Sequence, residues 1–364
     1  MSEKESLILN LIEEDPFISQ NDLADKTGLS RSAVAGYVSS LTKQGKLLGR
    51  AYVIPKKKRV LCVGGANIDR KFQMLEELVN HTSNPVNSSA SCGGVARNIA
   101  ENLGRLDVDV SLMTVVGEDH EGKWLLEKTA TFVEVDPSQK LPNQSTGTYT
   151  AVLDKDGELQ VAFASMSIYD SINPDFVDEK WGYFASAELV MIDTNFPADV
   201  LEKIITRCEI ENIPVCITTV STPKVKRLPV SLKGVKWLIA NQDEAEALAG
   251  YKISSEADLF KAAEIIMEKG VEKVIITRGD KGLIYYTKDL GSGVLIPPKV
   301  EVVDVTGAGD SLVAGIMYAS LKGVNIENAC KVGMTCSILT LQSKETVNSN
   351  LSPSKIEETN SQYF

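Results

Sequence analysis

Asp304-Val-Thr-Gly-Ala-Gly-Asp310 is the stretch that decides the predicted fold, and the apolar run SLVAGIMYASLKG follows it directly. Its small residues let the backbone turn sharply and approach a ligand closely. The amides of Gly307, Ala308 and Gly309 then open a helix, where anions are stabilised. Asp310, in the first turn, is placed to accept a proton from a hydroxyl that attacks a phosphoryl group. The alternative at this point is a tight strand-to-helix turn capped by Asp310.

The region before this stretch alternates between strands and helices. Helical patterns at 95–106 and 258–270 separate apolar, β-branched runs, which predicts a parallel sheet covered on both faces. Two stretches, 70–91 and 144–168, break the alternation, and the second predicts a hairpin turning at Asp156-Gly157. A β flap beside an α/β body is a candidate active-site lid. The runs read as strands are 59–67, 109–117, 188–193, 213–219, 236–241, 273–279 and 282–287.

Polar residues follow the first strand and open the first helix of this body. Asn67 and Asp69 come where the first strand ends, at the edge where open α/β sheets bind ligands. Gly93 and Gly94 open the helical pattern, and Asn98 sits one turn into it. We interpret these residues as partners of a polyhydroxy ligand. An Asx turn and close helix–sheet packing remain alternatives.

Two further polar groups follow later strands. Asn241 and Glu244 come after the strand at 236–241, and a carboxylate with an amide there suits a water-rich Mg²⁺ near phosphates. A helix start with N-terminal acids explains the same residues. Thr277-Arg-Gly-Asp-Lys-Gly282 follows the next strand and also fits a hairpin turn.

The N-terminal segment has a different character. It predicts three helices within Ser2–Glu14, Ser19–Gly28 and Arg31–Gln44, and then a hairpin at 46–55. Residues 1–59 carry a net charge of +3, and the remainder carries −14. We therefore divide the chain into a small domain at 1–55, a charged linker at 56–59 and a body at 60–364, and expect different partners for the two domains.

Composition excludes several classes of protein. No apolar run approaches the ~20 residues of a membrane span, and the acidic N-terminus does not resemble a signal peptide. Six scattered cysteines without a CxxC pair fit reduced thiols rather than a disulfide framework, and two histidines argue against a His-rich metal centre. We expect a cytoplasmic protein with no membrane partner.

Taken together and in this order, the motifs of residues 59–350 resemble the ribokinase (PfkB-type) carbohydrate kinase family. The resemblance implies a ribokinase-like three-layer α/β sandwich with a small β lid, an ATP-dependent kinase, and Asp310 as the catalytic base. It assigns the amides of Gly307, Ala308 and Gly309 to an anion hole, and it implies that Glu244 organises Mg²⁺ through water. A monovalent cation such as K⁺ is expected beside Asp304 and Thr306. The implied substrate-binding residues are Asn67, Asp69, Gly93, Gly94 and Asn98, and the implied ATP-binding residues are Asn241, Thr277, Gly279 and Gly282.

Finer features narrow the acceptor. The segments 93–106, 143–149, Asp193-Thr194-Asn195 and 346–350 resemble pseudouridine kinases and related nucleoside kinases. The resemblance implies 5′-phosphorylation of pseudouridine. Ala164-Ser165-Met166 departs from the Asn-Asp-Met run expected in the flap, which puts base recognition in question. The alternatives are another sugar or nucleoside kinase, for ribose, inosine or guanosine, and a nucleoside-sensing transcriptional regulator with a kinase-like body.

The N-terminal domain resembles a winged helix-turn-helix. The resemblance places Arg31, Ser32 and Tyr37 toward a DNA groove. Lys43, Lys46, Arg50 and Lys56–Lys58 could meet phosphates. The alternative is a packing or dimerisation module that does not bind DNA. Pairing of the β flap between two subunits would give the homodimer expected from relatives.

Overall fold

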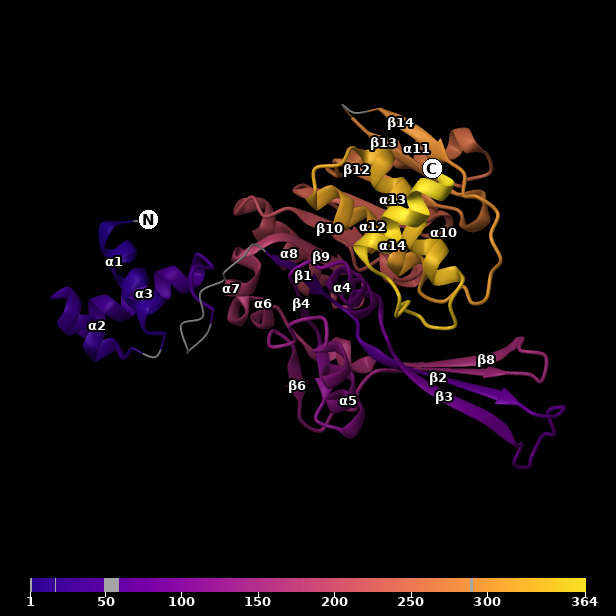
Figure 1. Ribbon diagram of the computed structural model, residues 1–364, viewed down its shortest axis with the longest axis horizontal. Coiled ribbons are helices and arrows are strands. Elements are labelled where there is room, and N and C mark those ends of the chain that lie inside the picture. Colours follow the sequence, from indigo (N-terminus) through magenta and orange to yellow (C-terminus); the bar gives the residue numbers. More distant parts are fainter. Residues whose placement is uncertain (1, 17, 49–58, 289–290) are drawn as a thin grey trace.

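A central eight-stranded sheet organises the body of the protein in this computed structural model, which describes residues 2–16, 18–48, 59–288 and 291–364 (Figure 1). The strands from β12 to β4 are parallel, and β13 and β14 are antiparallel at one edge. This arrangement confirms the predicted, mainly parallel α/β sheet. In spatial order the strands are β14 (Ser292–Leu295), β13 (Leu283–Thr287), β12 (Lys273–Thr277), β11 (Val235–Asn241), β10 (Val215–Thr218), β9 (Ala187–Asp193), β1 (Arg59–Val63) and β4 (Val110–Met113).

Helices cover both faces of this sheet because its strands are apolar on both sides. In β1, Val60 and Cys62 join the core on one face, while Leu61 and Val63 join the core on the other. The first core includes α4 (Val95–Arg105), α5 (His120–Thr129), α12 (Ala308–Leu321), α13 (Ile326–Leu341) and α14 (Pro353–Tyr363). The second includes η1 (Ser167–Ser171), α6 (Asp175–Glu179), α7 (Trp181–Ala185), α8 (Ala198–Ile210), α10 (Gln242–Ala249) and α11 (Glu256–Glu268), and α9 (Thr222–Val225) contacts α10.

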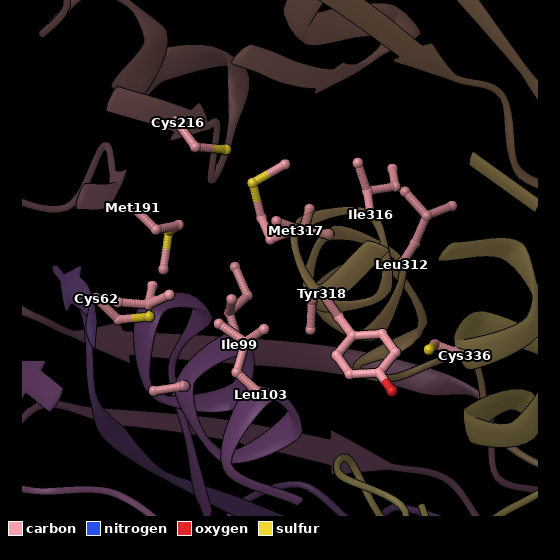
Figure 2. Close-up of a cluster of buried hydrophobic side chains, with 14 of the residues drawn as sticks. Cys62, Ile99, Leu103, Met191, Cys216, Leu312, Ile316, Met317, Tyr318 and Cys336 are labelled. Atoms are coloured by element: carbon pink, nitrogen blue, oxygen red, sulfur yellow. The ribbon is translucent and has the colours of Figure 1, made fainter. Parts of the chain in front are cut away.

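Sulfur-containing side chains fill the first core between the sheet and α12. Met191 lies between Cys62 and Cys216 on neighbouring strands, and Met317 of α12 faces them (Figure 2). All six cysteines are buried as free thiols: Cys62, Cys92, Cys208, Cys216, Cys330 and Cys336.

A second sheet of four strands projects from the body (Figure 1). Its order is β3 (Val86–Gly93), β2 (Asn67–Met74), β7 (Thr148–Leu153) and β8 (Leu159–Ser165). The β7–β8 hairpin turns at Asp156-Gly157, where the Asp154 carboxylate accepts hydrogen bonds from the amides of Asp156 and Glu158. The two stretches that interrupt the strand–helix alternation thus form one sheet, which we call the lid.

Two details differ from the sequence analysis. The run 109–117 is split, because β4 pairs with β1 whereas β5 (Val115–Gly117) pairs with β6 (Gln139–Leu141). Arg59 was given both to the linker at 56–59 and to the strand run at 59–67, and it is the first residue of β1. Its guanidinium pairs with Glu134 and donates to the Ser111 hydroxyl, so its charge is paired within the body of the protein.

The N-terminal domain contains three helices around its own core. They are α1 (Glu3–Glu14), α2 (Gln20–Thr27) and α3 (Arg31–Lys43), and the side chains of Ser2, Ser19 and Ser30 cap their N-termini. Arg31 and Ser32 are exposed at the start of α3, but Tyr37 packs partly against the domain core, so it is not fully available to a groove. The predicted hairpin from residue 49 onward, Arg50 and Lys56–Lys58 lie outside the described residues.

The end of α3 meets α7 of the body, and a glycine on each side permits close approach. A Cβ at Gly45 would lie 2.5 Å from the amide nitrogen of Ser186, and one at Gly182 would lie 3.3 Å from the Thr42 carbonyl oxygen. The N-terminal helices and the lid lie at opposite ends of the molecule (Figure 1). In the described ranges, no helix is both long and apolar enough to cross a membrane.

Candidate active site

The turn into α12 has the geometry that its glycines predict. Gly307 adopts a left-handed conformation, with φ of 80°, immediately before the helix begins at Ala308. The Ala308 amide donates to the Val305 carbonyl at 3.3 Å, whereas those of Gly309 and Asp310 belong to a first turn that offers no helical acceptor. Such amides favour an anion.

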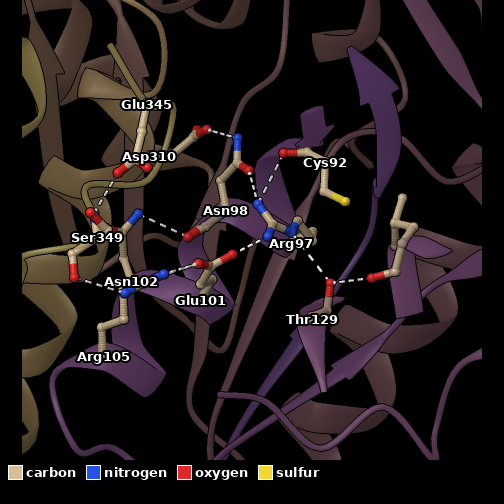
Figure 3. Close-up of polar contacts among 11 residues, drawn as sticks. Cys92, Arg97, Asn98, Glu101, Asn102, Arg105, Thr129, Asp310, Glu345 and Ser349 are labelled. Atoms are coloured by element: carbon tan, nitrogen blue, oxygen red, sulfur yellow. Dashed lines mark hydrogen bonds and ion pairs between the residues drawn. The ribbon is translucent and has the colours of Figure 1, made fainter. Parts of the chain in front are cut away.

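Asp310 points its carboxyl group at Asn98 of α4, and the two side chains meet across the site (Figure 3). Asn98 Nδ2 donates to Asp310 Oδ2 at 2.8 Å. Burial raises the pKa of Asp310 to about 7, and the charges of Asp193 and Asp69 act in the same direction, whereas the Asn98 hydrogen bond opposes them. A carboxyl group with this pKa can both accept and release a proton near neutral pH.

We expect the acceptor kcat/KM to rise with pH up to about 7 and then level off, because only ionised Asp310 accepts a proton. Stability should change in the opposite direction. The pKa of this group moves from 3.8 to about 7 on folding, so the folded state binds more protons between these values. The group's stabilising contribution is complete below pH ~4 and is lost as pH rises through ~7. A pH–rate profile and urea unfolding across pH 5–9 measure both; a rate flat from pH 5.5 to 8 would contradict the assignment.

A buried ionic network fixes the orientation of the Asn98 amide. Arg97 donates to Asn98 Oδ1 at 3.0 Å and to the Cys92 carbonyl at 3.1 Å, so Asn98 turns its NH₂ group toward Asp310. Arg97 also pairs with Glu101, which in turn pairs with Arg105 at 2.7 Å (Figure 3). The sequence analysis assigned Asn98 to an acceptor hydroxyl, and here its amide contacts the expected base itself.

The other expected acceptor residues meet at the base of the lid. Asn67 Nδ2 donates to Asp69 Oδ1 at 2.6 Å. Gly93 lies opposite Asn67 in the β2–β3 register, and a Cβ there would lie 2.0 Å from Asp69 Oδ2. Gly94 has φ of 100°, and a Cβ would lie 2.5 Å from the Gly65 carbonyl oxygen. Burial raises the pKa of Asp69, while the Asn67 hydrogen bond and the charges of Lys71 and Arg97 lower it.

A cavity of about 640 Å³ lies on the other side of the α12 turn. It brings the expected nucleotide residues Thr277, Gly279 and Gly282 together with Ala308 and Gly309. The size and mixed lining suit a cofactor-sized ligand. The remaining lining residues are Asp280, Leu283, Pro297, Pro298, Lys299, Val300, Val302, Val305, Leu312, Met334, Ser337, Ile338 and Leu341.

Asn241 and Glu244 lie next to this region and form a capping box at the start of α10. Asn241 is opposite Thr277 in the β11–β12 register. Glu244 Oε2 accepts from the Asn241 amide at 2.9 Å and from the Thr219 hydroxyl at 2.5 Å, while Asn241 Oδ1 accepts from the Glu244 amide. The alternative interpretation of these two residues, a helix start with N-terminal acids, therefore describes their local structure correctly. One fixed carboxylate still fits a Mg²⁺ held mostly by water and phosphates. Among the described residues, no three His, Cys, Asp or Glu side chains cluster as a metal centre.

Asp304 joins the lid to the α12 turn. Its carboxylate accepts from Lys71 Nζ of β2 at 2.8 Å and from the Thr306 amide and hydroxyl at 2.8 and 2.6 Å. Burial acts to raise the pKa of Asp304, but these hydrogen bonds and the Lys71 charge outweigh it and lower the pKa to about 2. The side chain thus remains an anion that pairs with Lys71.

The sequence analysis did not predict the contacts that three residues make in this site, namely Lys71, Tyr169 and Asp193. Lys71 lies on a lid strand with no motif around it. Tyr169 donates its hydroxyl to the Ala66 carbonyl at 2.7 Å and accepts from the Ala66 amide at 2.9 Å. Asp193 accepts from the Gly65 amide at 2.8 Å. A carboxylate ending an apolar strand was the available signal for Asp193.

Comparisons with known proteins identify the fold and the families to which the two domains are similar. Residues 1–47 match the family described as winged helix-turn-helix DNA-binding. The chain is 30% identical over 97% of both chains to YeiI, an uncharacterised sugar kinase of Escherichia coli, and 31% identical to the pseudouridine kinase of E. coli over 82% of this chain and 95% of that protein. The structure of Arabidopsis thaliana ribokinase complexed with ribose and ATP superposes with a TM-score of 0.73 at 19% identity, covering 83% of this chain and 98% of that one, which confirms the ribokinase-like fold. Residues 57–353 match the family described as pfkB family carbohydrate kinase, and the chain belongs to this family of sugar and nucleoside kinases.

Proposed function

We propose that this protein transfers the γ-phosphoryl group of ATP to the 5′-hydroxyl of a nucleoside, with pseudouridine as the favoured acceptor. The carrying observation is the placement of Asp310. Its carboxylate lies in the first turn of α12 and accepts a hydrogen bond from Asn98, and the preceding residues Ala308 and Gly309 line the cavity. An acceptor hydroxyl in that position would be within reach of both the base and the phosphoryl group.

In the proposed reaction, Asp310 takes the proton of the 5′-hydroxyl as its oxygen attacks the γ-phosphorus. The bond from that phosphorus to the bridging oxygen breaks, and ADP leaves with the electron pair. The amides at the start of α12 stabilise the charge that develops on the transferring group. Asp69 and Asn67 hold other ribose hydroxyls. Mg²⁺, organised from the Glu244 side, would neutralise the phosphates. A monovalent cation beside Asp304 and Thr306 would be tested by comparing KCl with LiCl.

The choice of pseudouridine rests on the resemblance of segments 93–106, 143–149, 193–195 and 346–350, and on the E. coli pseudouridine kinase relative. Purified protein would be given ATP with pseudouridine, uridine, inosine, guanosine, ribose or fructose 6-phosphate, and ADP release would be measured. We expect the highest kcat/KM for pseudouridine. A clear preference for ribose, fructose 6-phosphate or inosine would contradict the choice of pseudouridine as the favoured acceptor. Turnover of no acceptor would favour the nucleoside-sensing regulator.

We also propose that the N-terminal domain binds DNA through the start of α3. Arg31 and Ser32 are exposed there, while the other end of the helix meets the body. Anisotropy of labelled upstream DNA at ~50 mM salt tests this. Arg31→Ala should weaken binding, whereas Lys4→Ala, which removes an exposed charge from α1, should not. No binding by the unmodified protein at that salt would support a packing role.

The lid is our proposed dimer contact. It leaves β3 and β8 as edge strands, and β8 exposes apolar side chains, with Phe163 60% exposed. Sedimentation should give a dimer that Phe163→Glu weakens. Val230→Glu, at an 88% exposed position away from the lid, is the matched control.

A further inference from the structure

Asp193 is a fully buried carboxylate that joins three separate segments at the acceptor side of the site. It ends β9, and its Oδ2 accepts from the amide of Gly65 at 2.8 Å and from the amide of Ala96 at 3.1 Å. Asn195 adds its own amide at 2.8 Å and its side-chain NH₂ group at 2.9 Å. One side chain thus holds the turn after β1 and the first residues of α4.

The surrounding glycines leave room for this carboxylate. A Cβ at Gly64 would lie 2.2 Å from Asp193 Oδ1, and one at Gly65 would lie 2.3 Å from Asn195 Nδ2. The backbone of the turn therefore rests directly on the polar groups of Asp193 and Asn195. Neither turn can move without breaking hydrogen bonds to a buried group, which is costly.

Both turns carry acceptor residues. Asn67 and Asp69 follow the Gly65 turn, and Asn98 follows Ala96 by two positions on α4. The same carboxylate thus sets the relative placement of the groups that face Asp310.

Every one of these contacts donates to Asp193, which is the pattern of an ionised acceptor. Asn195 links Asp193 to a cation, because the Lys224 ammonium donates a hydrogen bond to Asn195 Oδ1. Burial lowers the pKa of Lys224, and the charge of Asp193 acts to raise it again. Burial raises the pKa of Asp193, while the backbone hydrogen bonds, Asn195 and Lys224 oppose that shift.

We propose that Asp193, kept ionised by Asn195 and Lys224, is a positioning residue that holds the Gly65 turn and the start of α4 so that Asp69 and Asn98 face Asp310. The proposal deepens the proposed function and rests on Asp310 as the base. It predicts a role in acceptor use and none in ATP binding, because the cavity that contacts Thr277 and Gly309 does not include Asp193.

Asp193→Asn tests this with almost no change in volume. A carboxamide has one acceptor oxygen, so its NH₂ group must face at least one of the four donors. We expect acceptor kcat/KM to fall on the order of 10²-fold, the cost of a small misplacement of reacting groups, with the KM for ATP unchanged within about twofold. Asp178→Asn, a surface carboxylate that pairs with Lys203 and Arg207, is the matched control and should behave as the unmodified protein.

The pH–rate profile separates positioning by a charge from simple packing. Asp310 is faced by Asn98 and Arg97 of α4, Asp69 of the lid and Asp193 of β9. Removing the Asp193 charge should move the acid limb of kcat/KM to lower pH. Lys224→Met should move it in the same direction, because it removes the cation that keeps Asp193 ionised and so weakens the negative charge beside Asp310.

Shifts of the acid limb to lower pH in both variants support the proposal. An unchanged acceptor kcat/KM in folded Asp193→Asn would overturn it, and so would equal losses for acceptor and ATP. If Asp193→Asn does not fold, an unmoved acid limb in Lys224→Met overturns it. The measurements use whichever acceptor the panel identifies, so a wrong acceptor does not affect them, and a wrong base assignment appears separately in Asp310→Asn.

Discussion

Asp310→Asn is expected to lower kcat by about 10²- to 10⁴-fold, the range that a general base supplies. The amide cannot accept a proton at neutral pH, yet it has the shape of the carboxyl group. Its oxygen can still accept the hydrogen bond from Asn98, so the site should keep its form. The cavity that we assign to ATP is lined by other residues, and ATP binding should change by less than about twofold.

Single-turnover kinetics and calorimetric ATP titration of the same preparation measure the two quantities. Asp178→Asn again serves as the control for removing a carboxylate. Near-normal kcat in Asp310→Asn would show that another group takes the proton. Loss of ATP binding together with kcat would indicate that the substitution disturbed the α12 turn.

Gly307→Ala is expected to damage both stability and turnover. Gly307 has φ of 80°, which costs an L-residue roughly 1–2 kcal/mol. In addition, the new Cβ would lie 2.0 Å from the Thr346 carbonyl oxygen, so backbone must shift. We expect the free energy of unfolding to fall by more than about 2 kcal/mol. We expect kcat to fall by on the order of 10²-fold, because the displaced amides no longer stabilise the charge that develops on the transferring phosphoryl group.

Gly323→Ala is the matched control, because it lies just past the other end of α12. Its φ is 75°, but nothing lies within 4 Å of an added Cβ. This variant should lose only about 1 kcal/mol of stability and keep its kcat. Urea unfolding and steady-state kinetics compare the two, and equal effects would mean that the contact with Thr346 has no importance.

Local features of this protein could be predicted from sequence, because their causes lie within a few residues. The serine caps of α1, α2 and α3, the left-handed Gly307 and the hairpin at Asp156-Gly157 are of this kind. The parallel sheet followed from strands that are apolar on both faces. The family resemblance placed Asn98 and Asp310 in one site, but it did not predict the hydrogen bond between them.

Contacts between distant segments could not be predicted in the same way. Asp193 and Gly65 are 128 positions apart, and Lys71 and Asp304 are 233 apart. Nothing in the sequence around Lys71 specifies a partner at that distance. Similarly, the sequence left Arg59 between the charged linker and the first strand, because its partners, Ser111 and Glu134, are distant in the chain.

Because every cysteine is buried, the rate at which each thiol reacts reports how often its part of the folded protein opens. A thiol reagent can modify the folded chain only after a local opening, and burial further suppresses the reactive thiolate by raising the pKa of Cys216 and Cys92. Cys92 lies at the lid base beside the acceptor residues, whereas Cys216 lies in the middle of the sheet. Labelling at the first position should therefore follow opening of the lid and slow when an acceptor binds, while labelling at the second should follow unfolding of the whole body.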